Sequence, residues 1–106
     1  MNSNQIKLQI DYNCSSCIVK NSTITENIDT LKSIGLSIDT INNMNSLGIL
    51  FDQQIDWNYG QPRTDLTPAY FKAYNQLREL VVEQIYKEIG DKFEIENKLH
   101  KFNIAE

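Results

Sequence analysis

Residues 23–41 read TITENIDTLKSIGLSIDTI, and this stretch contains the start of one expected helix, its end and the start of a second. Thr23 followed by Glu26 has the spacing of a capping box, in which both side chains satisfy free amides at a helix N-terminus. Gly35 stands where a helix ends in the left-handed conformation that glycine adopts readily. Ser37 is a favourable cap for the second helix. The stretch therefore predicts two helices joined by a tight corner.

Leu36 lies between these two expected helices and can contact both. It follows Gly35 at the position where the residue beyond a helix end packs back on the last turn, here on Leu31. It also precedes the Ser37 cap, from where it can pack on Ile41 as a hydrophobic staple. We therefore expect Leu36 to be buried at the centre of the corner.

The helical pattern continues along the rest of the chain. Thr67-Pro68 marks a helix start, Gly90 marks its end, and apolar residues recur at helical spacing between them. We expect helices over residues 24–34, 38–55, 68–89 and 92–102. They predict a mainly α protein, a compact bundle of four to five helices that forms a single helical domain over residues 1–106.

The two ends of the chain leave an alternative open. Ile6, Leu8 and Ile10 alternate with polar residues, as in a strand, yet Ile6 and Ile10 also share a helical face. The other alternating stretch is KFEIE at residues 92–96. The alternative is an α+β fold with a short strand at each terminus, the two ends being paired. The sequence does not decide whether residues 5–12 form a strand or a helix.

Composition and charge restrict the location and the class of the protein. The chain has 106 residues, of which 41% are hydrophobic and 23% charged, and its formal net charge is -4. This is the composition of a small globular domain. The sequence contains no run of about eighteen apolar residues, the length that a membrane span needs. Residues 1–11 lack the basic start and the apolar run of a signal peptide. We expect a cytoplasmic protein without membrane contact.

The charge pattern disfavours nucleic acid as a partner. Fourteen acidic residues outnumber ten basic ones, whereas phosphate binding usually needs a concentrated basic face. The alternative is a DNA-associated regulator, which as an oligomer would gather Lys20, Lys32, Lys72 and Arg78 on one face.

Cys14-Ser15-Ser16-Cys17 has the CxxC spacing of redox pairs and of zinc half-sites. A redox pair needs a βαβ context, which does not follow, and only His100 and carboxylates could complete a zinc site. Inward packing of two small apolar side chains explains the spacing better. We therefore predict no metal and no cofactor, and a thiol or metal protein that uses Cys14 and Cys17 stays an alternative.

Aromatic residues concentrate between positions 51 and 74, where six of the ten occur. Some of them fall in the loop 56–66, and Trp, Tyr and Arg are the residues that dominate binding hot spots. We expect this loop and the start of the next helix to bind another protein through Trp57, Tyr59, Arg63, Asp65 and Tyr70. The alternative is that Trp57 and Tyr59 cover the end of the core.

The sequence shows no catalytic signature. It contains no nucleophile elbow, phosphate-binding loop or zinc-protease motif. We therefore predict no catalytic residues and no enzyme activity. The expected function is that of a small acidic protein that binds another protein, as a regulatory subunit, an adaptor or an inhibitor. A homodimer stays open as a second kind of partner.

Overall fold

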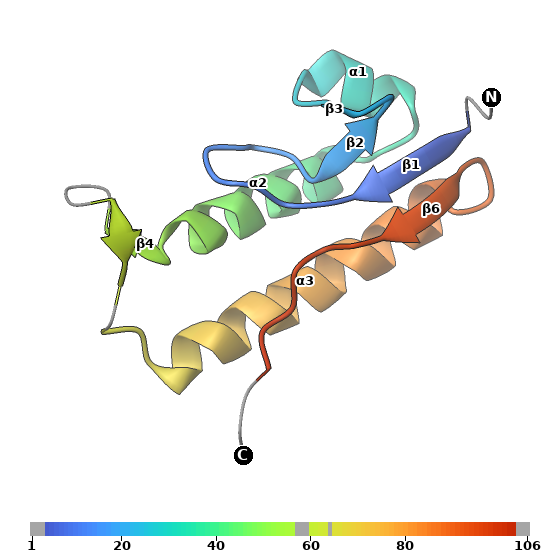
Figure 1. The fold of residues 1–106 in the computed structure, drawn as a ribbon. Helices are drawn as coiled ribbons and strands as arrows, with labels where there is room; N and C mark the ends of the chain where they lie inside the picture. The colour runs from blue at the N-terminus through green and yellow to red at the C-terminus, as the bar shows by residue number, and fades with distance from the viewer. Residues whose placement is uncertain (1–3, 57–59, 64, 104–106) are drawn as a thin grey trace.

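A computed structural model describes residues 4–56, 60–63 and 65–103. These residues contain one four-stranded sheet, a short hairpin and three helices (Figure 1). In chain order the elements are β1 (Gln5–Leu8), β2 (Ile18–Lys20), β3 (Thr23–Ile24), α1 (Ile28–Ser33), α2 (Ile38–Asp52), β4 (Ile55–Asp56), β5 (Gln61–Pro62), α3 (Pro68–Ile89) and β6 (Glu94–Asn97).

The two ends of the chain meet in the sheet, whose strand order is β3-β2-β1-β6. β1 pairs antiparallel with β2 and parallel with β6, so that Ile6 lies opposite Ile95. Ile6 and Leu8 are buried in the main core, whereas Lys7 between them is not. One face of β1 therefore packs on the helices, as the alternation in the sequence indicates.

The prediction of a helical bundle is wrong, because the fold is α+β. The expected helix over 92–102 is replaced by β6 and an extended C-terminal segment. A parallel partner for β1 must be reached through a crossover connection, which α2 and α3 provide here. The α+β alternative, with paired strands from the two ends of the chain, agrees with this sheet, although β2 and β3 were not foreseen.

The predicted capping box at Thr23 is also wrong. Thr23 and Ile24 pair with β2 as strand β3, and α1 begins only at Ile28. The cap is Asn27, whose side-chain oxygen accepts a hydrogen bond from the Thr30 amide at 3.1 Å. Asn is at least as good an N-cap as Thr, and the later start frees Ile24 to pair with Val19.

The other helix signals are confirmed. Ser37 caps α2, Thr67 caps α3, and α3 spans the residues expected for it. Gly35 has a φ of 114°, and Leu36 behind it is 3% exposed. α2 ends at Asp52, earlier than expected, and the chain then turns into β4. In the described residues, none of the helices is long and apolar enough to span a bilayer.

The long helices α2 and α3 lie side by side (Figure 1), and Glu88 joins their ends. Its carboxylate accepts hydrogen bonds from the Ser37 amide at 2.7 Å, the Ser37 hydroxyl at 2.9 Å and the Thr40 hydroxyl at 2.7 Å. Burial by itself would raise the pKa of Glu88, but these hydrogen bonds and nearby Lys87 lower it by more. The charged carboxylate thus stabilises the N-terminus of α2.

The Glu88 contacts predict acid sensitivity. Because the native pKa of Glu88 is below its ordinary value, its contribution to stability is complete above the ordinary pKa and is lost as the pH falls through the native one. We expect the difference in unfolding free energy between the wild-type chain and Glu88→Gln to shrink from neutral pH to about pH 3. Urea unfolding across this range measures it, and a constant difference would contradict the assignment.

Candidate protein-binding surface

One end of the molecule is built from aromatic rings that come from four separate segments of the chain. Tyr12 stacks on Phe51 with ring centroids 4.8 Å apart, and His100 and Phe102 are 4.5 Å apart. Phe51 lies 6.0 Å from His100, which links the two pairs. We call this group the aromatic end, and its members are Tyr12, Phe51, Tyr70, Phe71, Tyr74, His100 and Phe102.

The aromatic end is buried at its base and open at its surface. Tyr74 is fully buried, and Phe51 is 9% exposed. Tyr12 is 37% exposed, His100 is exposed, and Phe102 is half-buried. Rigid aromatic side chains therefore reach solvent while their inner faces rest on the core, which is the arrangement of a binding anchor.

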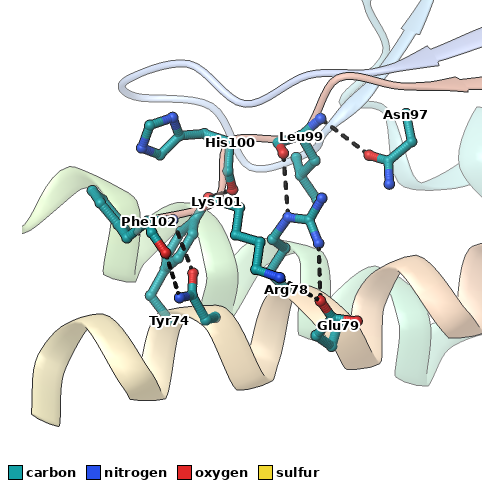
Figure 2. A network of polar contacts seen from close by, with 9 residues as sticks. Tyr74, Arg78, Glu79, Asn97, Leu99, His100, Lys101 and Phe102 are labelled. Atoms are coloured by element: carbon teal, nitrogen blue, oxygen red, sulfur yellow. Dashed lines mark hydrogen bonds and ion pairs between the residues drawn. The ribbon is translucent and has the colours of Figure 1, made fainter. Parts of the chain in front are cut away.

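The C-terminal segment after β6 closes one side of the aromatic end and runs along α3 (Figure 2). The Tyr74 hydroxyl donates to the His100 carbonyl at 2.9 Å, and Arg78 Nε donates to the Leu99 carbonyl at 3.2 Å. The Asn75 amide group both donates to and accepts from the Phe102 backbone, at 2.9 and 3.1 Å. Side chains of α3 thus supply the backbone hydrogen bonds that a neighbouring strand would otherwise supply, and they fix Phe102 in place.

Three of the residues expected from the sequence, Arg63, Asp65 and Tyr70, lie at the same end. The Arg63 guanidinium donates two hydrogen bonds to the Asp65 carboxylate, at 2.9 and 2.8 Å, and its backbone amide donates to the Gln54 carbonyl. The Tyr70 hydroxyl donates to the Leu50 carbonyl. The hydrogen bonds from the Arg63 side chain hold the pKa of Asp65 below its usual value. Trp57 and Tyr59 lie outside the described residues.

Tyr12 lies near the Tyr70 hydroxyl and affects its pKa. Burial raises the pKa of Tyr70, Arg63 lowers it, and Tyr12 and Asp52 raise it further. The Tyr70 hydroxyl donates to the carbonyl of Leu50, the residue before the Phe51 on which Tyr12 stacks. The structure therefore brings Arg63 and Tyr70 together with Tyr12, which sequence reasoning missed. No local signal in the sequence marks Tyr12 as part of this surface, because its neighbours come from α2 and α3.

The two cysteines face conditions that disfavour the thiolate. Burial raises the pKa of Cys17 to about 12. Burial also raises the pKa of Cys14, as do the carboxylates of Glu26, Asp11 and Asp52. Metal binding and redox exchange both need the thiolate. Within residues 4–56, 60–63 and 65–103, no group of three potential metal ligands lies together.

A pocket of about 530 Å³ lies elsewhere, at the sheet. Gln5, Lys7, Glu94 and Glu96 contribute to its lining, and Gln5 donates to Glu94 at 3.3 Å. Its charges are mixed, and no aromatic side chain lines it. The aromatic end has the composition of a hot spot, and this pocket does not.

A family model described as Serratia CdiI immunity protein-like matches residues 4–98. None of the curated proteins matches the chain. CdiI immunity proteins bind and inhibit a toxin and are inhibitors rather than enzymes. At this level the match supports the predictions that the chain binds another protein, acts as an inhibitor and is not an enzyme.

The matched range begins one residue before β1 and ends one residue after β6. It therefore includes every helix and strand of the described chain, from the first paired strand to the last. A match of this extent covers the fold and is not confined to a single motif. The chain belongs to the Serratia CdiI immunity protein-like family.

Proposed function

We propose that this protein inhibits its toxin by binding it through the aromatic end, with Tyr12 as a central anchor. The observation that supports the proposal most strongly is the 4.8 Å stacking of a 37% exposed Tyr12 on the buried Phe51. Tyrosine has few rotatable bonds, and the stacking restricts them before the partner arrives. Binding therefore loses little side-chain entropy.

The charge of this end favours a basic partner surface. The chain has an isoelectric point near 4.9, and Asp11 and Asp65 lie at the aromatic end, beside Tyr12 and Arg63. Arg63 is held in a fixed orientation by the Asp65 carboxylate and by the Gln53 carbonyl, to which it donates at 3.4 Å. Complementary charge of this kind raises the association rate and excludes wrong partners.

The sequence adds two anchors to the proposal. Trp57 and Tyr59 precede Arg63 in the loop 56–66, and we propose that they contact the toxin beside it. Action in the cytoplasm and a homodimer stay predictions. Trp57→Ala tests the contribution of this loop. We expect it to weaken toxin binding in the calorimetry described below for Tyr12→Ala.

Tyr12→Ala is expected to weaken toxin binding at least about tenfold, because it removes a packed aromatic anchor from the interface. The partner is first captured from the native host by the tagged wild-type chain, identified by mass spectrometry and purified. Calorimetry with this purified protein then gives the affinity of each variant. Thermal melting shows whether each variant is folded.

Tyr86→Ala is the matched control. Tyr86 is also an exposed tyrosine, at 43%, but it lies near the far end of α3, where its hydroxyl is 3.4 Å from the Ile95 carbonyl. We expect this variant to bind within about twofold of the wild-type chain. Equal losses for the two variants, or a loss only for Tyr86→Ala, would place the toxin elsewhere on the molecule.

A further inference from the structure

We infer that Asp52 is a positioning residue, which together with Gly48 holds the loop 11–14 so that Tyr12 is presented to the toxin. This inference rests on the proposed function, because it takes Tyr12 as an anchor. Asp52 and Gly48 lie in the last two turns of α2, and Phe51, on which Tyr12 stacks, lies between them. Three contacts from one stretch of helix therefore determine where the loop runs.

The contact from Asp52 is a hydrogen bond to the loop backbone. The Asn13 amide donates to Asp52 Oδ1 at 2.9 Å, across 39 residues of sequence. Asn13 has a φ of 60°, a left-handed conformation that costs energy for residues with a side chain, although Asn tolerates it better than most. Such a conformation persists where the surroundings hold it, and Asp52 supplies part of that hold.

Gly48 provides the second contact, by close approach. A Cβ at this position would overlap the carbonyl oxygen of Cys14. The loop therefore rests directly on the backbone of α2, and any side chain at position 48 would push it outward. Glycine is unfavourable inside a helix, and this close approach explains its presence in α2.

Within the loop itself, the Tyr12 amide donates to Asp11 Oδ1 at 2.8 Å, and the Cys14 thiol donates to the Tyr12 carbonyl at 3.6 Å. The backbone on both sides of Tyr12 is thus fixed before any partner binds. If only a fraction of the molecules held the loop in this way, the apparent affinity would fall to that fraction of its full value. The positioning contacts therefore act on the rate of productive encounter.

The variant Asp52→Ala tests the inference through binding kinetics. We expect association with the purified toxin to slow about fivefold, with dissociation changed less than about twofold, because fewer molecules have Tyr12 in place. A lost direct contact would instead speed dissociation. Asp52→Asn keeps an oxygen acceptor for the Asn13 amide and should restore association to near the wild-type rate. Asp91→Ala removes an exposed acid at the other end of α3 and serves as the charge control.

A second measurement follows the loop without the toxin. Hydrogen exchange of the Asn13 amide should accelerate in Asp52→Ala and in Gly48→Ala, while both variants keep the wild-type circular dichroism spectrum. Faster exchange with unchanged association in both variants would overturn the inference, as would equal losses for Asp52→Ala and Asp52→Asn. If Tyr12→Ala binds as the wild-type chain does, the proposed function fails as well. If Tyr12→Ala weakens binding and Asp52→Ala does not, the positioning role alone fails.

Discussion

Leu36→Ala is expected to lower the free energy of unfolding by about 2–4 kcal/mol. Leu36 is 3% exposed and belongs to the main core together with Leu31 and Ile41, which are 1% and 5% exposed. Its amide donates to the Leu31 carbonyl at 3.2 Å, so the backbone cannot easily move to fill the space left by the truncated side chain. The loss is therefore the transfer energy of the removed carbons plus that of a cavity.

Ile38→Ala provides the comparison for Leu36→Ala. Ile38 is an aliphatic residue of similar size only two positions away, but it is 46% exposed. Its replacement should cost less than about 1 kcal/mol, because little apolar surface returns to water. Urea denaturation of both variants measures the two losses. Equal losses would show that burial at the corner between α1 and α2 does not determine the stability there.

The corner at Leu36 was predictable because its signals are local. At this corner Gly35 and Ser37 act on the backbone within one helical turn, as their neighbours in the sequence imply. The Thr67-Pro68 pair acts in the same local way at the start of α3. The sheet depends on a different kind of information. Ile6 faces Ile95 across 89 positions of sequence, and its alternation with polar residues was also compatible with a helical face.

The failed prediction at Thr23 has the same origin. The capping box was a valid local signal, but Asn27 supplies a second cap, and strand pairing between Ile24 and Val19 decides between them. Strand pairing is a tertiary interaction, so it can override a cap that is sufficient in isolation. The expected helix at 92–102 failed likewise, because β1 offers the residues of β6 backbone partners that a helix would not use.

The same difference between local and distant signals applies to the candidate surface. Arg63, Asp65 and Tyr70 could be grouped from the sequence, since they are neighbours in one loop and the next helix. Tyr12 and Phe102 could not, because one precedes and the other follows this region by many residues. They meet only where α2, α3 and the C-terminal segment converge. Sequence reasoning could therefore name only the part of the candidate surface that is contiguous in the chain.

Tyr74→Ala is expected to have the largest effect on stability, a loss of about 3–5 kcal/mol. Tyr74 is fully buried, and its ring lies 4.9 Å from that of Phe102 and 6.2 Å from that of Phe51. It therefore joins α3 both to α2 and to the C-terminal segment. Burial raises the pKa of Tyr74, so its hydroxyl stays protonated and donates to the His100 carbonyl.

Tyr74→Phe separates the contribution of the ring from that of the hydroxyl. The phenylalanine keeps the aromatic packing and removes only the hydrogen bond to His100, which should cost about 1–2 kcal/mol. Because that bond holds the C-terminal segment against α3, hydrogen exchange of residues 98–103 should accelerate in Tyr74→Phe more than that of β1. Guanidinium unfolding measures the two losses in stability. If Tyr74→Phe proved as damaging as Tyr74→Ala, the hydroxyl and not the ring would be what holds the aromatic end together.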